Sequence, residues 1–142
     1  MLVFLKFGEG GSGFGVEPGL QNDLTMVKSL MTHIESTLCV DAARVYATGM
    51  SDGGAMTSIL ACTASDKFAA FAAVAVIIFC AGKGTRPVAI AAFSGTADPI
   101  VPFNGGAVHC CGGAVLGSAP DAMAGWAAHD HCGKQFTDTR LG

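Results

Sequence analysis

The chain has 142 residues, of which 51% are hydrophobic and 13% are charged, so it predicts one folded domain, 1–142, and excludes intrinsic disorder. The net charge of -3 and the scatter of its eight basic residues argue against a nucleic-acid partner. The longest apolar run, 68–80, is shorter than the roughly 18 residues that cross a bilayer, so we expect no membrane partner.

The N-terminal part predicts a strand, a loop and a helix. Residues 2–7 are apolar and favour a short strand, but residues 1–7 lack the basic region and cleavage site of a signal peptide. The glycine-rich stretch 8–15 lacks the G-K-[ST] ending of a phosphate loop, which favours a backbone turn. Apolar residues recur at helical spacing over 20–38, which predicts an amphipathic helix with His33 on its solvated side.

The most informative segment is 44–54, Arg-Val-Tyr-Ala-Thr-Gly-Met-Ser-Asp-Gly-Gly. A β-forming stretch leads into G-x-S-x-G, and apolar residues at helical spacing follow over 55–62. This context indicates a nucleophile elbow, in which a sharp strand-to-helix turn exposes the hydroxyl of Ser51. The backbone N–H of Asp52 would then stabilise an oxyanion. The alternative is an ordinary turn with an incidental serine.

The later elements predict the fold class. Residues 71–78 and 88–93 are continuous apolar runs typical of strands buried on both faces. Ser118 and Pro120 then favour the start of a helix that continues to 131. Alternating strands and helices predict an α/β protein with a doubly wound, mostly parallel sheet in three layers.

An acidic residue follows the second of these strands. Asp98 lies in the loop 94–103, which is expected at the same edge of the sheet as Ser51. There it would accept the Nδ1–H of a histidine and so fix the tautomer of that ring. The alternative is that Asp98 and Pro99 only begin a turn.

Six cysteines indicate the redox compartment. Their even number and the absence of a C-x-x-C pair favour disulfides in an exported protein over a metal site. Cys39 precedes the strand that leads to Ser51 and Cys62 ends the helix that follows, so we expect these two to form a bridge. The alternative is a set of small buried thiols. The cysteines are Cys39, Cys62, Cys80, Cys110, Cys111 and Cys132.

Several motifs together resemble one family. The segments 39–54, 60–62, 68–70, 86–88 and 95–106, followed by Trp126 and Cys132, are similar in kind and order to the extracellular polyhydroxybutyrate depolymerase and feruloyl esterase family. The resemblance covers about 20–132 and implies a minimal α/β-hydrolase fold, Ser51 as nucleophile and Asp98 as the acid. It also implies a secreted, disulfide-bonded enzyme without metal or organic cofactor. Its substrates would be polyester chains or small esters, including aromatic acids on plant polysaccharide.

The chain departs from this family in three places. Ser94 stands where the family has a non-catalytic histidine before the acid. The family's His-Gly oxyanion loop corresponds at best to 7–11, so the second oxyanion donor would be the N–H of Glu9. The loop that carries the family's catalytic histidine, beyond the tryptophan-bearing helix, has no counterpart in this sequence.

The base must therefore be another histidine, or be missing. His109 hangs from the loop that leaves the catalytic edge and is our first choice, whereas His129 and His131 are expected near the opposite edge. The prediction is a serine carboxylic-ester hydrolase. The alternative is an inactive hydrolase core that acts as a binding module or forms a homo-oligomer in which a neighbouring copy covers an exposed sheet edge.

Overall fold

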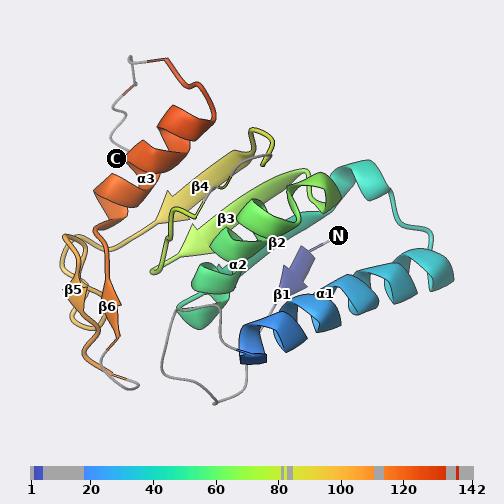
Figure 1. Ribbon diagram of the computed structural model, residues 1–142, viewed down its shortest axis with the longest axis horizontal. Coiled ribbons are helices and arrows are strands. Elements are labelled where there is room, and N and C mark those ends of the chain that lie inside the picture. The colour runs from blue at the N-terminus through green and yellow to red at the C-terminus, as the bar shows by residue number, and fades with distance from the viewer. Residues whose placement is uncertain are drawn as a thin grey trace, which may run out of the picture.

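The computed structural model describes residues 2–4, 18–80, 82, 85–110, 114–133 and 137. These residues form a parallel sheet of four strands in the order β1-β2-β3-β4, with helices packed on it and a small separate hairpin (Figure 1). The α/β class is confirmed. In chain order the elements are β1 (Leu2–Phe4), α1 (Pro18–Thr37), the 3-10 turn η1 (Ala42–Arg44), β2 (Tyr46–Met50), α2 (Asp52–Thr63), the 3-10 turn η2 (Ser65–Lys67), β3 (Ala70–Val74), β4 (Ala89–Phe93), β5 (Gly106–Ala107), β6 (Val115–Leu116) and α3 (Ala119–His129).

One hydrophobic core joins the helices to one face of the sheet. Helix α1 contributes Leu24, Val27 and Met31 to the same cluster as Leu60 of α2 and Trp126 of α3. The strands add alternate residues, among them Ala47, Phe71 and Ala73. The predicted amphipathic helix is confirmed, and His33 is exposed as expected. Leu30 and Leu38 belong to the apolar pattern predicted over 20–38, but both are exposed, and Leu38 lies beyond the end of α1.

The opposite face of the sheet is open among the described residues. Tyr46 and Met50 are 40% and 71% exposed, and Phe93 is 59% exposed. Met50, Val74 and Phe93 lie side by side in register, as do Tyr46, Ala70 and Ala89. The prediction that the strands are buried on both faces is therefore wrong for the part of the chain that the structure describes. The doubly wound, three-layer arrangement is likewise not seen there, because helices cover one face only.

Strand β3 is shorter than its apolar run. It ends at Val74 because Ala75 takes a φ of 65° and reverses the chain. The residues after the turn then run alongside α2. The backbone N–H of Ile78 donates to Ser58 Oγ of that helix at 3.1 Å. The predicted strand 71–78 was too long because periodicity does not distinguish a buried strand from an extended segment packed on a helix.

The disulfide within this unit joins Cys62 to Cys80, with 5.9 Å between their Cα atoms. The predicted bridge between Cys39 and Cys62 is wrong. Cys39 is exposed just beyond the end of α1, and its thiol forms no disulfide with another described cysteine. The reversal at Ala75 carries Cys80 to the end of α2 instead. The partner of Cys62 depended on that reversal, which the sequence pattern did not indicate.

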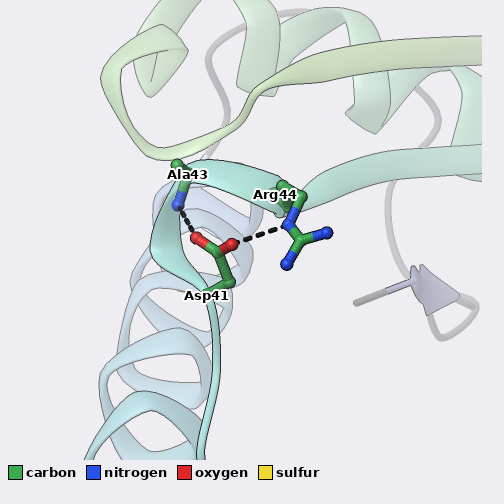
Figure 2. Close-up of polar contacts among 3 residues, drawn as sticks. All are labelled: Asp41, Ala43 and Arg44. Atoms are coloured by element: carbon green, nitrogen blue, oxygen red, sulfur yellow. Dashed lines mark hydrogen bonds and ion pairs between the residues drawn. The ribbon is translucent and has the colours of Figure 1, made fainter.

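A short polar turn leads the chain into β2. Asp41 caps η1 by accepting a hydrogen bond from the N–H of Ala43 at 3.0 Å, and its other oxygen pairs with Arg44 Nε at 2.6 Å (Figure 2). Both ionic side chains are largely exposed, so this pair adds little to stability. Its effect is local, because the capped turn fixes where the strand toward Ser51 begins.

No helix in the described ranges is long and apolar enough to cross a membrane.

Candidate active site

Ser51 occupies a sharp turn between β2 and α2. Its backbone has φ 56° and ψ -119°, a combination that non-glycine residues rarely adopt. The turn is held by a hydrogen bond from the Ser51 N–H to the carbonyl of Val74 at 3.0 Å. The Ser51 carbonyl accepts from Gly54 and Ala55 at 2.9 and 3.0 Å. Strand, turn and helix therefore have the arrangement that the elbow prediction requires.

The hydroxyl of Ser51 has no structural task in the described part of the chain. Ser51 is exposed at the N-cap of α2 but makes no capping hydrogen bond with its side chain. Ser118 behaves differently at the N-cap of α3, where its hydroxyl accepts from the N–H of Asp121 at 3.1 Å. Capping is the usual reason for a serine at this position, so its absence leaves the Ser51 hydroxyl available for chemistry.

The first backbone N–H groups of α2 lie beside this hydroxyl. Asp52 is the first residue of the helix, and N–H groups of a first turn have no acceptor earlier in the helix. The positive end of the helix dipole adds to their attraction for an anion. The Asp52 N–H therefore lies at the N-terminal end of α2, and its role as an oxyanion donor stays a prediction. Glu9, the predicted second donor, lies outside the described residues.

Two glycines let the turn close. A Cβ at Gly49 would lie 2.4 Å from the carbonyl oxygen of Gly53. A Cβ at Gly54 would lie 2.6 Å from the carbonyl oxygen of Val76 and 2.7 Å from that of Val74. These neighbours are backbone atoms, which cannot rotate aside. The glycines of the motif are thus required by close approach of strand and helix.

We expect Gly54→Ala to destabilise the protein by about 1–3 kcal/mol or more, because the helix must move away from β3 to admit the methyl group. Urea denaturation followed by circular dichroism measures the loss. Gly117→Ala is the matched control, since a Cβ there meets nothing within 4 Å. Equal stability of the two variants would contradict the close packing described for the turn.

Asp98 begins a tight turn after β4. Its Oδ1 accepts hydrogen bonds from the N–H groups of Ile100 and Val101 at 2.8 and 3.0 Å. The bonds from Val101 and Ile100 lower the pKa of Asp98 below its usual value, so the carboxylate stays charged at neutral pH. The turn predicted as the alternative role of Asp98-Pro99 is therefore present. The sequence signal for this turn was Asp98 itself, because an Asp side chain commonly accepts a hydrogen bond from the backbone N–H two residues later.

His109 lies against this turn. Its backbone N–H donates to the carbonyl of Ile100 at 2.9 Å, and its Nδ1 is 3.0 Å from the carbonyl oxygen of Pro99. A carbonyl oxygen only accepts, so Nδ1 carries the proton in this bond. The neutral ring then has Nε2 as its acceptor nitrogen, and the residue is exposed. This tautomer is the one that a general base needs.

A small hydrophobic cluster connects the three segments. Ala55 in the first turn of α2 packs with Val76 and Val101, and Val108 packs against them. Ala55 is four residues from Ser51, Val101 donates to Asp98, and Val108 precedes His109. The cluster therefore anchors the elbow, the acid turn and the histidine to one another. We name it the linking cluster.

Ser51 and Asp98 follow strands that run in the same direction in one sheet. Ser51 follows β2 and Asp98 follows β4, so their loops start two strands apart, about 10 Å at the usual strand spacing. The parallel strands point toward one edge of the sheet, on the side of the β5–β6 hairpin (Figure 1). No hydrogen bond joins Ser51 to Asp98 or His109 among the described residues.

The other two histidines lie at the opposite edge, as predicted. Helix α3 begins near Phe103, whose carbonyl accepts from the N–H of Ala119 at 2.9 Å. It ends where Asp130 accepts from the N–H of Val88, one residue before β4. His129 packs on the ring of Trp126, and His131 is exposed beyond the helix end. Neither is placed to act on Ser51.

A small hollow borders the end of the turn that begins at Asp98, and the residues that line it have no polar side chains. Val101 and Phe103 line it together with the turn after β3 and the start of α3. Met50 and Ile100 are exposed. The hydroxyl of Ser94, which stands at the family's histidine position, is buried and has no hydrogen-bond partner in the described ranges. In the described segments no group of three or more His, Cys, Asp or Glu side chains could hold a metal ion.

Comparison with known proteins gives one consistent group of relatives. The chain is 40% identical over 86 residues to a probable feruloyl esterase C of Aspergillus niger. The matched region covers 59% of this chain and 32% of the relative. It is 37% identical over 86 residues to feruloyl esterase C of Emericella nidulans, with the same coverage. It is 37% identical over 91 residues to feruloyl esterase B of Piromyces equi, which covers 60% of this chain and 17% of that relative.

No family model and no solved structure matches the chain. The chain spans about a third of the length of the first of these relatives. The matches support the feruloyl-esterase side of the resemblance, and the polyhydroxybutyrate side stays a prediction. Over about 60% of its length, this chain is therefore similar to feruloyl esterases.

Proposed function

We propose that the chain is a serine carboxylic-ester hydrolase built on an α/β-hydrolase core, with Ser51 as nucleophile. The observation that carries this proposal is the turn at Ser51, which has a strained backbone and an exposed hydroxyl without a structural partner in the described part. Strain of this kind persists only where surrounding structure holds it, and it is concentrated at functional sites. The names of the relatives support ester hydrolysis.

The proposed reaction gives each of these groups one role. Ser51 Oγ attacks the ester carbonyl carbon while its proton passes to Nε2 of His109. The Asp52 N–H stabilises the oxyanion, and the Glu9 N–H is the proposed second donor. The protonated ring then gives its proton to the leaving alcohol, and an acyl-enzyme remains. Water attacks this intermediate by the reverse route and releases the acid, with no metal or organic cofactor in any step.

The proposed substrate is an ester with an apolar or aromatic acyl group. Exposed Met50 and Ile100 at the catalytic edge offer apolar surface next to Ser51. The relatives are named for feruloyl esters, which have an aromatic acyl group, and this favours a small aromatic ester over a polyester chain. The Cys62–Cys80 disulfide supports an exported protein.

Hydrolysis of methyl ferulate by the full chain, together with labelling by a fluorophosphonate, tests the proposal. We expect release of ferulic acid and one phosphonate adduct, located on Ser51 by peptide mass spectrometry. Hydrolysis without labelling at Ser51 would assign the chemistry to another group. Absence of both would favour the inactive binding or oligomerising module, for which concentration-dependent association is the supporting measurement.

A further inference from the structure

Two residues with a left-handed backbone meet at one carbonyl group. Ser51 has a φ of 56° and Ala75 has a φ of 65°, values that residues other than glycine rarely adopt. The Val74 carbonyl oxygen accepts from the Ser51 N–H at 3.0 Å and from the Val76 N–H at 2.9 Å. The second bond closes a γ-turn centred on Ala75, and its positive φ marks the rare, strained form of that turn. One oxygen atom therefore joins the γ-turn to the backbone of the proposed nucleophile.

The elbow also packs directly on this γ-turn. A Cβ at Gly54 would lie 2.7 Å from the Val74 carbonyl oxygen and 2.6 Å from that of Val76, so both carbonyls border the first turn of α2. The Ala75 N–H donates to the Phe93 carbonyl at 2.8 Å, which attaches the centre of the γ-turn to the end of β4. The γ-turn is thus in contact with the elbow and with the last residue of the neighbouring strand.

The chain after the γ-turn is fastened to two helices. Ser58 Oγ of α2 accepts from the N–H of Ile78 at 3.1 Å, and Trp126 Nε1 of α3 donates to the carbonyl of Ile78 at 2.9 Å. The disulfide joins Cys80 to Cys62 in the last turn of α2. The chain before the γ-turn is held in β3. Strained backbone persists where the surrounding structure holds it, and here both ends of the γ-turn are held.

We infer that Ala75 is a positioning residue for Ser51, because its left-handed conformation directs the Val74 carbonyl toward the Ser51 N–H. The inference rests on the proposed function, since it assigns a role within the same site, but it does not depend on which group serves as the base. Ala75 acts through a backbone hydrogen bond to the residue that carries the attacking oxygen. A displacement of about 1 Å at a reacting group lowers the rate by about 10²-fold, so a change in the γ-turn is expected in kcat.

Substitutions at Ala75 that differ in their tolerance of positive φ test this role. Glycine adopts that region freely and asparagine does so readily, whereas β-branched threonine is an outlier there. Asparagine and threonine are both small and polar, so this pair separates backbone conformation from side-chain size. We expect Ala75→Gly and Ala75→Asn to keep most of the wild-type kcat for methyl ferulate, and Ala75→Thr to lose about 10²-fold in kcat with little change in KM.

Ala91→Thr is the matched control, because Ala91 is exposed in the middle of β4, where a β-branched residue fits. We expect it to keep full activity. Amide hydrogen exchange at Ser51 gives a readout that does not need turnover. The Ser51 amide is expected to exchange slowly in the wild type, Ala75→Gly and Ala75→Asn, and faster in Ala75→Thr. Thermal unfolding confirms that each variant is folded.

The outcomes separate this inference from the proposed function. A wild type without activity would overturn the proposed function. An active wild type together with full kcat, or unchanged exchange at the Ser51 amide, in a folded Ala75→Thr would overturn only the role of Ala75. Should Ala75→Thr not fold, the other two variants decide, because a large loss of kcat in Ala75→Gly or Ala75→Asn would equally overturn that role and retained kcat in both would support it.

Discussion

Ser51→Ala is expected to abolish ester hydrolysis while leaving the fold intact. The hydroxyl makes no hydrogen bond to the described residues, so its removal costs no packing or capping interaction. The nucleophile is nevertheless the atom that forms the acyl-enzyme, and its loss in such sites lowers kcat by about 10⁴-fold or more. The unusual combination of a large kinetic effect and unchanged stability is the signature of a catalytic serine.

Initial rates with methyl ferulate and thermal unfolding measure the two quantities. Ser36→Ala is the matched control, because Ser36 is exposed at the end of α1 and bonds only to the carbonyl of His33 among the described residues. We expect this variant to retain full activity. His109→Ala is expected to lose about 10²–10⁴-fold, the contribution of a general base. Full activity in Ser51→Ala would show that the elbow serine is incidental.

Trp126→Ala is expected to lower the free energy of unfolding by about 3–5 kcal/mol, the usual cost of truncating a buried tryptophan. Trp126 is fully buried in the main core, and its Nε1 donates to the carbonyl of Ile78 at 2.9 Å. The ring also meets Phe79 edge-on, with centroids 5.5 Å apart. Truncation thus leaves a cavity, and it leaves the carbonyl of Ile78 unpaired in the segment that comes after β3 and runs alongside α2.

Urea denaturation should be followed by far-ultraviolet circular dichroism, because Trp126 is the chain's single tryptophan and its fluorescence is lost in the variant. Trp126→Phe restores most of the volume but not the hydrogen bond, so we expect an intermediate loss. Phe93→Ala is the matched aromatic control, since Phe93 is largely exposed and surface substitutions usually change stability by about 0.5 kcal/mol or less. A Trp126→Ala loss no larger than that of Phe93→Ala would contradict the central place of α3 in the core.

The exposed face of the sheet raises the question of whether a second copy of the chain covers it. Parallel sheets are normally covered on both faces, yet Tyr46, Met50 and Phe93 are exposed among the described residues. The described patch holds no charged side chain, and its nine register positions on β2, β3 and β4 span a small area. Three strands about 4.8 Å apart and five residues long, at about 3.3 Å per residue, give a flat area of about 240 Å². This is less than the roughly 800 Å² that a stable interface buries on each partner.

The sequence by itself determined the local elements of the site. The helix over 20–38, the strand and helix around Ser51 and the strand before Asp98 all follow from residue periodicity and turn chemistry, which act over a few neighbours. The elbow was also predictable, because its glycines report a close backbone approach that no other residue permits. The parallel order of the strands then placed Ser51 and Asp98 at one edge.

Only the tertiary structure decided what these elements contact. The reversal at Ala75 brought Cys80 to Cys62, and an apolar run cannot indicate whether it continues as a strand or turns back along a helix. Burial of one sheet face alone was equally invisible, because alanine suits either environment. The attachment of His109 to the Pro99 carbonyl depends on packing of Val101 and Val108 in the linking cluster. Such contacts join residues distant in sequence, and no local pattern records them.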